Sequence, residues 1–262
     1  MSESDRPPTC DPELLERLAI DGLTVVPAAL RVQDVSALRA ELERAIEEDA
    51  AARPNVFDRG MVHNCMVRGA RMAALLDHPL MNAYLETAFS PTCILYAYQS
   101  SSLQPGQSNY GSRVHVDCPR FIDGYTTNLG VIVALDDFTD ANGATYYLKG
   151  SHLRDQIPDD KTFFEGASRG LCKAGDMILF NGRLAHAAGS NQTARARHAL
   201  TLNICRSFMR QRFDFPRLVP ASAIERLGPN GRRLIGMNVR MPTTLDEFYL
   251  PSEQRLYLPG QG

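Results

Sequence analysis

The stretch from residue 93 to residue 206 restricts the fold most strongly, because it alternates short apolar runs with turn signals. Runs of strand length, rich in β-branched and aromatic side chains, lie at residues 94–99, 129–135, 144–148, 177–181 and 199–204. Stretches typical of turns separate them, such as Asp-Ala-Asn-Gly at 140–143. Many short strands with intervening turns are typical of a β-sandwich or jelly roll, whose inner faces surround a cavity. The pattern therefore predicts a mainly β fold.

The flanking segments predict helices and loops. Apolar residues recur at spacings of three and four in three segments, which predicts helices at residues 11–18, 32–52 and 70–88. A short strand is expected at 23–27, and a further run of strand length lies at 61–68. The tail from residue 216 is rich in Pro, Arg and Gly, so we expect ordered loops that pack against the β fold, with a helical turn at 222–227.

No internal repeat or linker divides the chain, and its length suits a single domain. We expect one domain over 1–262, with N-terminal support at 10–90, a jelly-roll core at 93–206 and a loop-rich extension at 207–262.

Charge and targeting signals narrow the partners. The formal net charge is −2 and no basic block is present, which argues against nucleic-acid and membrane partners. The N-terminal residues are polar, and no apolar run is long enough to span a bilayer, so we expect a cytoplasmic protein that acts on a small molecule. The cysteines form no Cys-x-x-Cys pair, so we expect reduced thiols, mostly in the core. The oligomeric state stays open, with a homodimer among the options.

A metal-ligand pattern lies inside the β region. His115 and Asp117 are two positions apart, so on a strand both point to the same face. His186, in a loop after the run at 177–181, can supply a third ligand. Two histidines and one carboxylate are the ligand set of non-haem Fe(II) oxygenases, which keep the remaining coordination positions for a cosubstrate and O2.

If that cosubstrate is 2-oxoglutarate, its distal carboxylate needs a fixed cation. A guanidinium offers two parallel hydrogen bonds, and Arg197 at the start of a predicted strand can return to the same cavity. Arg195 shares the face of Arg197 by alternation, so the spacing does not exclude it.

An ordered set of motifs resembles one family. His115-Val-Asp117 matches a His-x-Asp motif, residues 134–145 match a strand and turn, and Lys149-Gly-Ser-His152 matches a Pro-Gly-Ser-His ending with lysine in place of proline. Gly175-Asp, His186, Asn191 and Arg197 match the segment with the distal histidine. Together with the N-terminal helix and strand, these motifs resemble the phytanoyl-CoA dioxygenase family of Fe(II)/2-oxoglutarate oxygenases over nearly the whole chain.

The resemblance implies a double-stranded β-helix, the cupin-like jelly roll. It implies Fe(II) on His115, Asp117 and His186, and 2-oxoglutarate on Arg197. Thr145 is implied as a cosubstrate ligand, although its hydroxyl could instead pack across strands. Related halogenases have glycine or alanine at the position of Asp117, so a carboxylate there favours oxygenation. Weaker cosubstrate candidates, all polar on or beside strands, are Gln99, Asn128 and Ser190.

The expected activity is therefore oxidation of an unactivated C–H bond, by default hydroxylation, with release of succinate and CO2. We expect a secondary metabolite or an amino-acid-derived molecule as substrate, in a pocket built from residues 57–68, 100–112, 119–128 and the tail from 206. Two alternatives remain: a catalytically silent relative that binds a metal or ligand, and a cupin-like enzyme that uses metal and O2 without 2-oxoglutarate.

Other residues receive structural or open roles. Asn191 is expected to stabilise the loop after His186 by hydrogen bonds to the backbone. The remaining histidines are expected to be structural: His63, His78, His152 and His198. Arginines whose roles stay open are Arg68, Arg120 and Arg206.

Overall fold

The structure is a computed structural model that describes residues 8–56, 58, 60–106 and 110–261. Two antiparallel sheets form its centre. The larger sheet has the strand order β1-β6-β3-β8-β2 and the smaller has the order β5-β4-β7. The strands are β1 (Leu23–Val26), β2 (Ile94–Leu103), β3 (Asn128–Ala134), β4 (Tyr146–Tyr147), β5 (Ser168–Arg169), β6 (Met177–Asn181), β7 (His186–Ala187) and β8 (Arg197–Cys205).

Helices precede, interrupt and follow the sheets. The N-terminal α-helices are α1 (Pro12–Asp21), α2 (Val32–Ala52), α3 (Ala70–Ala74) and α4 (Pro79–Ala88), and α5 (Asp160–Gly166) follows β4. The C-terminal ones are α6 (Phe215–Leu218), α7 (Ala221–Ile224), α8 (Pro229–Leu234) and α9 (Leu245–Phe248). Short 3-10 turns are η2 (Cys65–Val67), η3 (Leu75–Asp77), η4 (Tyr110–Ser112), η5 (Ser151–Leu153) and η6 (Ser252–Gln254).

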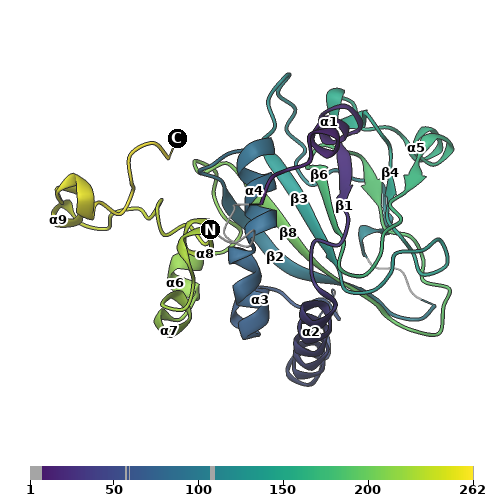
Figure 1. Cartoon of the computed structure of the whole chain (residues 1–262), viewed down its shortest axis with the longest axis horizontal. Helices are drawn as coiled ribbons and strands as arrows, with labels where there is room; N and C mark the ends of the chain where they lie inside the picture. The colour runs from purple at the N-terminus through teal and green to yellow at the C-terminus, as the bar shows by residue number, and fades with distance from the viewer. Residues whose placement is uncertain (1–7, 57, 59, 107–109, 262) are drawn as a thin grey trace.

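Alternation along the strands gives the larger sheet two apolar faces. On β3, Val131 and Val133 belong to the cluster that contains the buried side chains of α2, α3, α4 and α8. The neighbouring Ile132 belongs to another cluster, with Phe138 and Tyr147 from the segment that leads into the smaller sheet. The face of Val131 and Val133 is therefore the outer one, on which helices lie (Figure 1), and the face of Ile132 is directed into the interior between the sheets.

The strand expected at 23–27 is present as β1, and it joins the larger sheet although it lies outside the expected core at 93–206. β1 pairs along its length with β6, with Leu23 opposite Phe180, so the sheet does not begin at residue 93. The expected helix at 70–88 is interrupted: His78 is extended (φ −60°, ψ 119°) and Pro79 starts α4. Steric contact with a proline ring disfavours helical geometry at the preceding residue, which explains the break.

The run at 61–68 does not form a strand. Its only strand-like contact among the described residues is a single bridge between His63 and Gln99. Asn64 then adopts a left-handed conformation (φ 55°), and η2 follows. A left-handed residue reverses the chain direction, so the alternation needed for a longer strand ends there.

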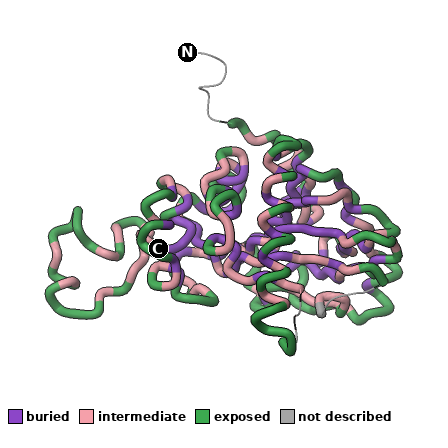
Figure 2. The backbone as a smooth tube through the Cα atoms, turned by 90° about the horizontal axis from the view of Figure 1, so that it is seen from below, coloured by how far each residue is buried: buried purple, intermediate pink, exposed green. Residues whose placement is uncertain are grey.

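The tail packs against the fold only in its first part. The backbone N–H groups of Gly228 and Gly231 donate to the carboxylate of Asp77, at 2.8 and 2.7 Å, which fixes α8 beside η3. The distal loop, residues 239–257, closes on itself through a bridge between Val239 and Tyr257 and extends away from the sheets (Figures 1 and 2). The expected packing is therefore wrong for this loop, whose local hydrogen bonds replace contacts with the β fold.

The described part of the chain contains no helix that is both long and apolar enough to cross a bilayer. All the cysteines are free, and those apart from Cys10 are buried, as expected.

Candidate metal and cosubstrate site

His115 and His186 are brought together by a backbone bridge. Each donates its N–H to the carbonyl of the other, at 3.0 and 2.9 Å. Residues 113–119 do not form the continuous strand that the sequence suggested, because this bridge is isolated outside the named strands. Directly opposed residues on antiparallel chains project their side chains to the same face, so the two imidazole centroids lie 4.1 Å apart.

The hydrogen bonds of both rings leave their Nε2 atoms available. Nδ1 of His115 donates to the carbonyl of Arg113 at 2.8 Å, and Nδ1 of His186 donates to that of Leu184 at 2.9 Å. The proton is thereby placed on Nδ1, and the Nε2 lone pair can bind a metal. Burial lowers the pKa of His186, although the charge of Asp117 opposes the shift. His186 therefore stays neutral at physiological pH, as a metal ligand must be.

Asp117 completes a cluster of three ligand groups. Its Oδ1 lies 3.8 Å from Nε2 of His115 and 3.6 Å from Nε2 of His186, and the three ligand atoms all lie within 4.8 Å of one another. Atoms that are each about 2 Å from one ion lie roughly 3–4 Å apart, so these separations suit a shared metal. The donor set of two neutral imidazoles and a carboxylate fits Fe(II).

A chain of amide groups holds the carboxylate from behind. Asn203 on β8 donates from Nδ2 to Oδ2 of Asp117 at 3.3 Å, which leaves Oδ1 directed at the histidines. Asn128 on β3 donates from Nδ2 to Oδ1 of Asn203 at 2.9 Å. Partners of this kind, behind a ligand, orient it and strengthen metal binding.

Aromatic side chains enclose His186. The ring of Phe180 lies edge-on at 5.1 Å between centroids, and Tyr147 stacks at 6.0 Å. Phe180 lies directly over Gly130, where a Cβ atom would approach the ring to 2.2 Å. Glycine at this position of β3 therefore provides the space for the ring that positions His186.

Arg197 is the most unusual side chain near the metal ligands. It is 2% exposed, and its guanidinium lies 4.1 Å from the centroid of Phe138. Nη1 donates to the carbonyl of Gly143 at 3.3 Å and Nη2 to the hydroxyl of Ser101 at 3.4 Å, whereas Nε has no acceptor. Within the described residues it forms no ion pair. Burial lowers the pKa of Arg197 to about 10.

A buried cation without a counter-ion is costly, so this site favours an anionic ligand. The carboxylate of 2-oxoglutarate fits that requirement. Arg195, which the spacing left open, is exposed, and its carbonyl accepts hydrogen bonds from the side chains of Asn191 and Thr193. The geometry thus selects Arg197 as the candidate anchor.

The ligand groups open onto a cavity of about 310 Å3. Gln99 and Thr145 line it, together with Ser101, which contacts Arg197. Asn128 and Ser190 do not: Asn128 is buried behind Asn203, and Ser190 is exposed. Neither side chain therefore faces the cavity in which a cosubstrate would bind.

The expected pocket segments are placed in part. Three of the expected segments contribute to the cavity: Met61 comes from 57–68, Ser101 and Gly111 come from 100–112, and Arg212 comes from the tail. Residues 57, 59 and 107–109 lie outside the described part of the chain. The segment at 119–128 lines a different hollow, beside α1, so its assignment to this pocket is wrong. It turns away because Thr126 and Asn128 hydrogen-bond to Asn181 and to Gly182 at the end of β6.

The arginines whose roles the sequence left open either form contacts outside the cavity or are exposed. Arg68 donates to Asp49 and Glu48 of α2, at 2.7 and 3.1 Å. Arg206 donates to the carbonyls of Thr126 and Phe89, and Arg120 is exposed. None of them lines the cavity.

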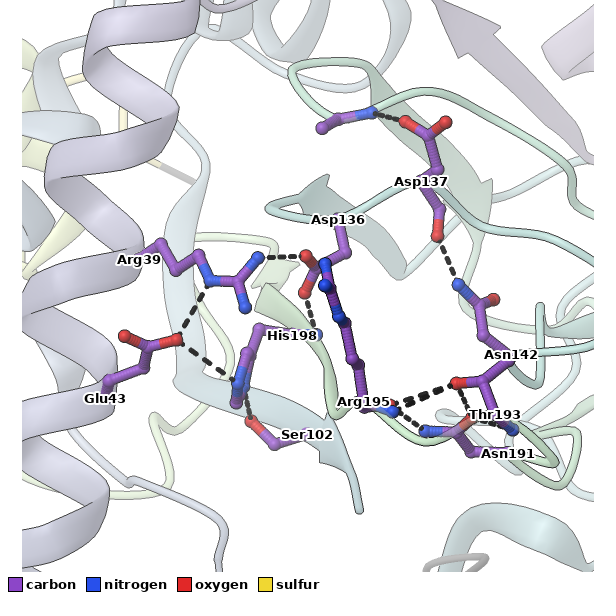
Figure 3. Close-up of polar contacts among 11 residues, drawn as sticks. Arg39, Glu43, Ser102, Asp136, Asp137, Asn142, Asn191, Thr193, Arg195 and His198 are labelled. Atoms are coloured by element: carbon purple, nitrogen blue, oxygen red, sulfur yellow. Dashed lines mark hydrogen bonds and ion pairs between the residues drawn. The ribbon is translucent and has the colours of Figure 1, made fainter. Parts of the chain in front are cut away.

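The histidines expected to be structural have structural partners. His198 lies between Ser102 on β2 and Glu43 on α2, beside Asp136 (Figure 3). His78 accepts from the N–H of Met81 at the start of α4, and Nε2 of His152 meets the carbonyl of Ala19. His63 pairs with Asp58.

Asn191 stabilises its loop as expected. It donates to the carbonyls of Leu103 and Arg195 and accepts from Thr193 (Figure 3).

Sequence reasoning missed Ser101, Asn203 and Arg212. Alternation from Arg197 places Thr201 and Asn203 on its face of β8, so a period of two was the available signal for Asn203. The register then places Ser101 opposite Ala199 on that same face. No comparable signal marked Arg212, which lies in the irregular segment after β8.

Comparison with known proteins decides the family. The model of the phytanoyl-CoA dioxygenase (PhyH) family matches residues 19–199. The chain belongs to this family. Its match covers α2, strands β1 to β7, the start of β8 and the positions of His115, Asp117, His186 and Arg197, so the resemblance inferred from the motifs is confirmed.

Relatives extend over most of the chain. The uncharacterized protein Rv1501 of Mycobacterium tuberculosis is 29% identical, with 92% of each chain covered. The dioxygenase cdmA of Talaromyces verruculosus is 28% identical (87% of this chain, 83% of the relative). The Fe(II)/2-oxoglutarate-dependent dioxygenase nvfF of Aspergillus novofumigatus is 26% identical (88% and 83%). Family and relatives thus indicate Fe(II)/2-oxoglutarate-dependent dioxygenase activity, with the cofactors that the sequence predicted.

A solved structure confirms the fold class. The epimerase SnoN, in a complex with Fe3+, α-ketoglutarate and nogalamycin RO, superposes with a TM-score of 0.58 at 22% identity, covering 74% of this chain and 82% of SnoN. The predicted jelly roll with flanking helices is therefore confirmed.

Proposed function

We propose that this protein is an Fe(II)- and 2-oxoglutarate-dependent hydroxylase of a small molecule, a secondary metabolite or an amino-acid derivative. One observation carries the proposal: a cluster of two histidines and an aspartate opens onto a cavity that Ser101 also lines, and Ser101 accepts a hydrogen bond from a buried arginine, Arg197, that forms no ion pair within the described residues. His115, Asp117 and His186 would hold Fe(II), and Arg197 would bind the distal carboxylate of 2-oxoglutarate.

When bound, Fe(II) and 2-oxoglutarate supply the oxidising chemistry, in which O2 is consumed, 2-oxoglutarate becomes succinate and CO2, and a substrate C–H bond becomes C–OH. The residues of the chain do the positioning. Neutral imidazoles and one carboxylate leave a face of the metal site to the cavity. Arg197 fixes one end of the cosubstrate by charge-assisted hydrogen bonds, and Thr145 can add a hydroxyl contact from the cavity wall. Phe180 and Ile132 give that wall an apolar surface that limits access of water.

Asp117 bears on the type of reaction. A carboxylate at this position occupies a coordination position that a halide would otherwise take, and the bond from Asn203 keeps it oriented toward the histidines. This favours transfer of oxygen over halogenation.

Formation of succinate tests the proposal. Wild-type protein supplied with Fe(II), O2 and 2-oxoglutarate should form succinate, and the Asp117→Ala and His186→Ala variants should not. His78→Asn is the matched control, because asparagine keeps an acceptor for the N–H of Met81 and lies outside the site. Retention of succinate formation in both alanine variants would show that the metal site is elsewhere. Its retention in Arg197→Gln would instead favour an enzyme that does not anchor 2-oxoglutarate there.

A further inference from the structure

An arginine other than Arg197 lies in the lining of the cavity onto which the candidate metal ligands open. Arg212 lines both the cavity of the metal ligands and an adjoining hollow between η2 and the segment that leads into α6. Its Nη1 donates to Oε1 of Gln99 at 3.0 Å, and its guanidinium lies 5.7 Å from the ring centroid of Tyr96. Its backbone N–H donates to the carbonyl of Tyr96 at 2.9 Å. Arg212 is therefore held against β2, with its charged group at the exposed side of the cavity.

Among the described residues, no acidic side chain forms an ion pair with Arg212. Around it in the adjoining hollow, Arg68 is paired with Asp49 and His63 with Asp58. Arg212 instead has only a neutral amide as its acceptor, and the ion pairs of the described residues do not include it. Asp117 is the one acidic residue among the described lining of the cavity, and it belongs to the proposed metal site.

The two guanidinium groups have separate surroundings. Arg197 is enclosed behind Ser101 and Phe138, whereas Arg212 is exposed. A cosubstrate anchored on Arg197 leaves Arg212 free for a different anion. The lining of the cavity is partly apolar, with Ile132 and Phe180 from the inner face of the larger sheet.

We infer that the substrate carries a carboxylate that Arg212 binds, with an apolar body extending toward the metal ligands. A single uncompensated guanidinium matches one carboxylate through two parallel hydrogen bonds. A coenzyme A ester is a poorer match, because its several phosphates would need further uncompensated cations and Arg68 is already paired. The inference rests on the proposed function, since it assigns a substrate class to that site.

Binding of simple probe acids tests the assignment without knowledge of the substrate. Hexanoate and phenylacetate are titrated by calorimetry, each against its primary amide, into anaerobic protein loaded with Fe(II) and 2-oxoglutarate. Wild type should bind at least one acid about 10-fold more tightly than its amide. In Arg212→Gln this preference should disappear, while the affinity for 2-oxoglutarate stays as in wild type. Arg212→Lys should keep part of it, and Arg210→Gln, an exposed neighbour outside the cavity lining, should keep all of it.

Three results would overturn the assignment: equal binding of each acid and its amide by wild type, an undiminished preference in Arg212→Gln, or a loss of 2-oxoglutarate affinity in that variant. The same titrations on metal-free protein separate this inference from the proposed function. A preference that depends on Arg212 in a protein that fails to bind Fe(II) or 2-oxoglutarate would support the carboxylate site and refute the oxygenase. Normal formation of succinate by a protein that binds each acid and its amide equally would support the oxygenase and refute the carboxylate site.

Discussion

At the scale of single residues, the metal ligands depend on partners that fix their orientation. Asn203 binds Oδ2 of Asp117, so Oδ1 remains for the metal. We expect Asn203→Leu to weaken Fe(II) binding by about 10- to 100-fold, because the carboxylate loses the partner behind it. Titration of metal-free protein with Fe(II) under anaerobic conditions measures this. Thr201→Val, a change of similar size on the same face of β8, should bind Fe(II) as wild type does; equal affinity in all three proteins would refute the role of Asn203.

The sequence predicts the chemistry of these residues better than their partners. His115, Asp117 and His186 could be chosen because their residue types and order fit a known ligand set. Alternation along β8 places Asn203 on the face of Arg197, but the contacts of Asn203 and Ser101 could not be predicted, because they depend on the register between neighbouring strands. That register is set by the packing of whole strands, and a shift of one residue would turn both side chains away.

At the scale of elements, β3 and β6 position His186 through one close contact. The ring of Phe180 occupies the space that a side chain at Gly130 would need. We expect Gly130→Ala to lower the free energy of unfolding by about 1–3 kcal/mol, because the ring must move against His186. Denaturant titration measures the change. Adding Phe180→Leu should recover part of the loss, since the smaller side chain leaves space; purely additive losses in the double variant would contradict the proposed contact.

The bounds of some strands and helices could be predicted from the local sequence pattern, and those of others could not. The central strands β3, β6 and β8 lie within a residue or two of the expected runs, because β3 and β6 are mostly apolar and buried on both faces, and β8 contains an alternating apolar run. β4 and β7 are only two residues long, and their pairing is decided by contacts between distant segments. The helix expected at 70–88 is divided just before Pro79, which starts α4, and this proline was a signal present in the sequence.

At the scale of the whole molecule, buried histidines make stability depend on pH. Burial lowers the pKa of His198 below its ordinary value of 6.5, and Arg39 and Arg197 act in the same direction, while Asp136 and Glu43 oppose it. The unfolded chain therefore takes up a proton at higher pH than the folded protein. Stability should be fully present above about pH 6.5 and fall as the pH drops below it.

The variant His198→Gln isolates this effect. It removes one titrating group and keeps a polar side chain near Ser102. The free energy of unfolding of this variant is measured on metal-free protein from pH 7.5 to 5. It should fall less steeply than that of wild type, and the two slopes should differ by at most about 1.4 kcal/mol for each pH unit. Parallel curves for the two proteins would show that His198 has the same pKa in the folded and the unfolded state.

The overall architecture was predictable because the alternation of strands and turns, together with the motifs, fixes a jelly roll with helices outside it. The course of the tail was not. Its distal loop bears exposed apolar side chains, including Met241 and Tyr249 at 73% and 74% exposure, and its composition alone did not distinguish packing against the sheets from a self-closed loop.

The most direct test of the central claim is anaerobic titration of the protein with Fe(II) and 2-oxoglutarate, followed by absorption spectroscopy. If His115, Asp117 and His186 bind Fe(II) and Arg197 anchors the cosubstrate, wild type should develop a charge-transfer absorption in the visible range. Arg197→Gln should need at least about 10-fold more 2-oxoglutarate to reach the same absorption. No absorption in wild type, or identical titrations of the two proteins, would contradict the account.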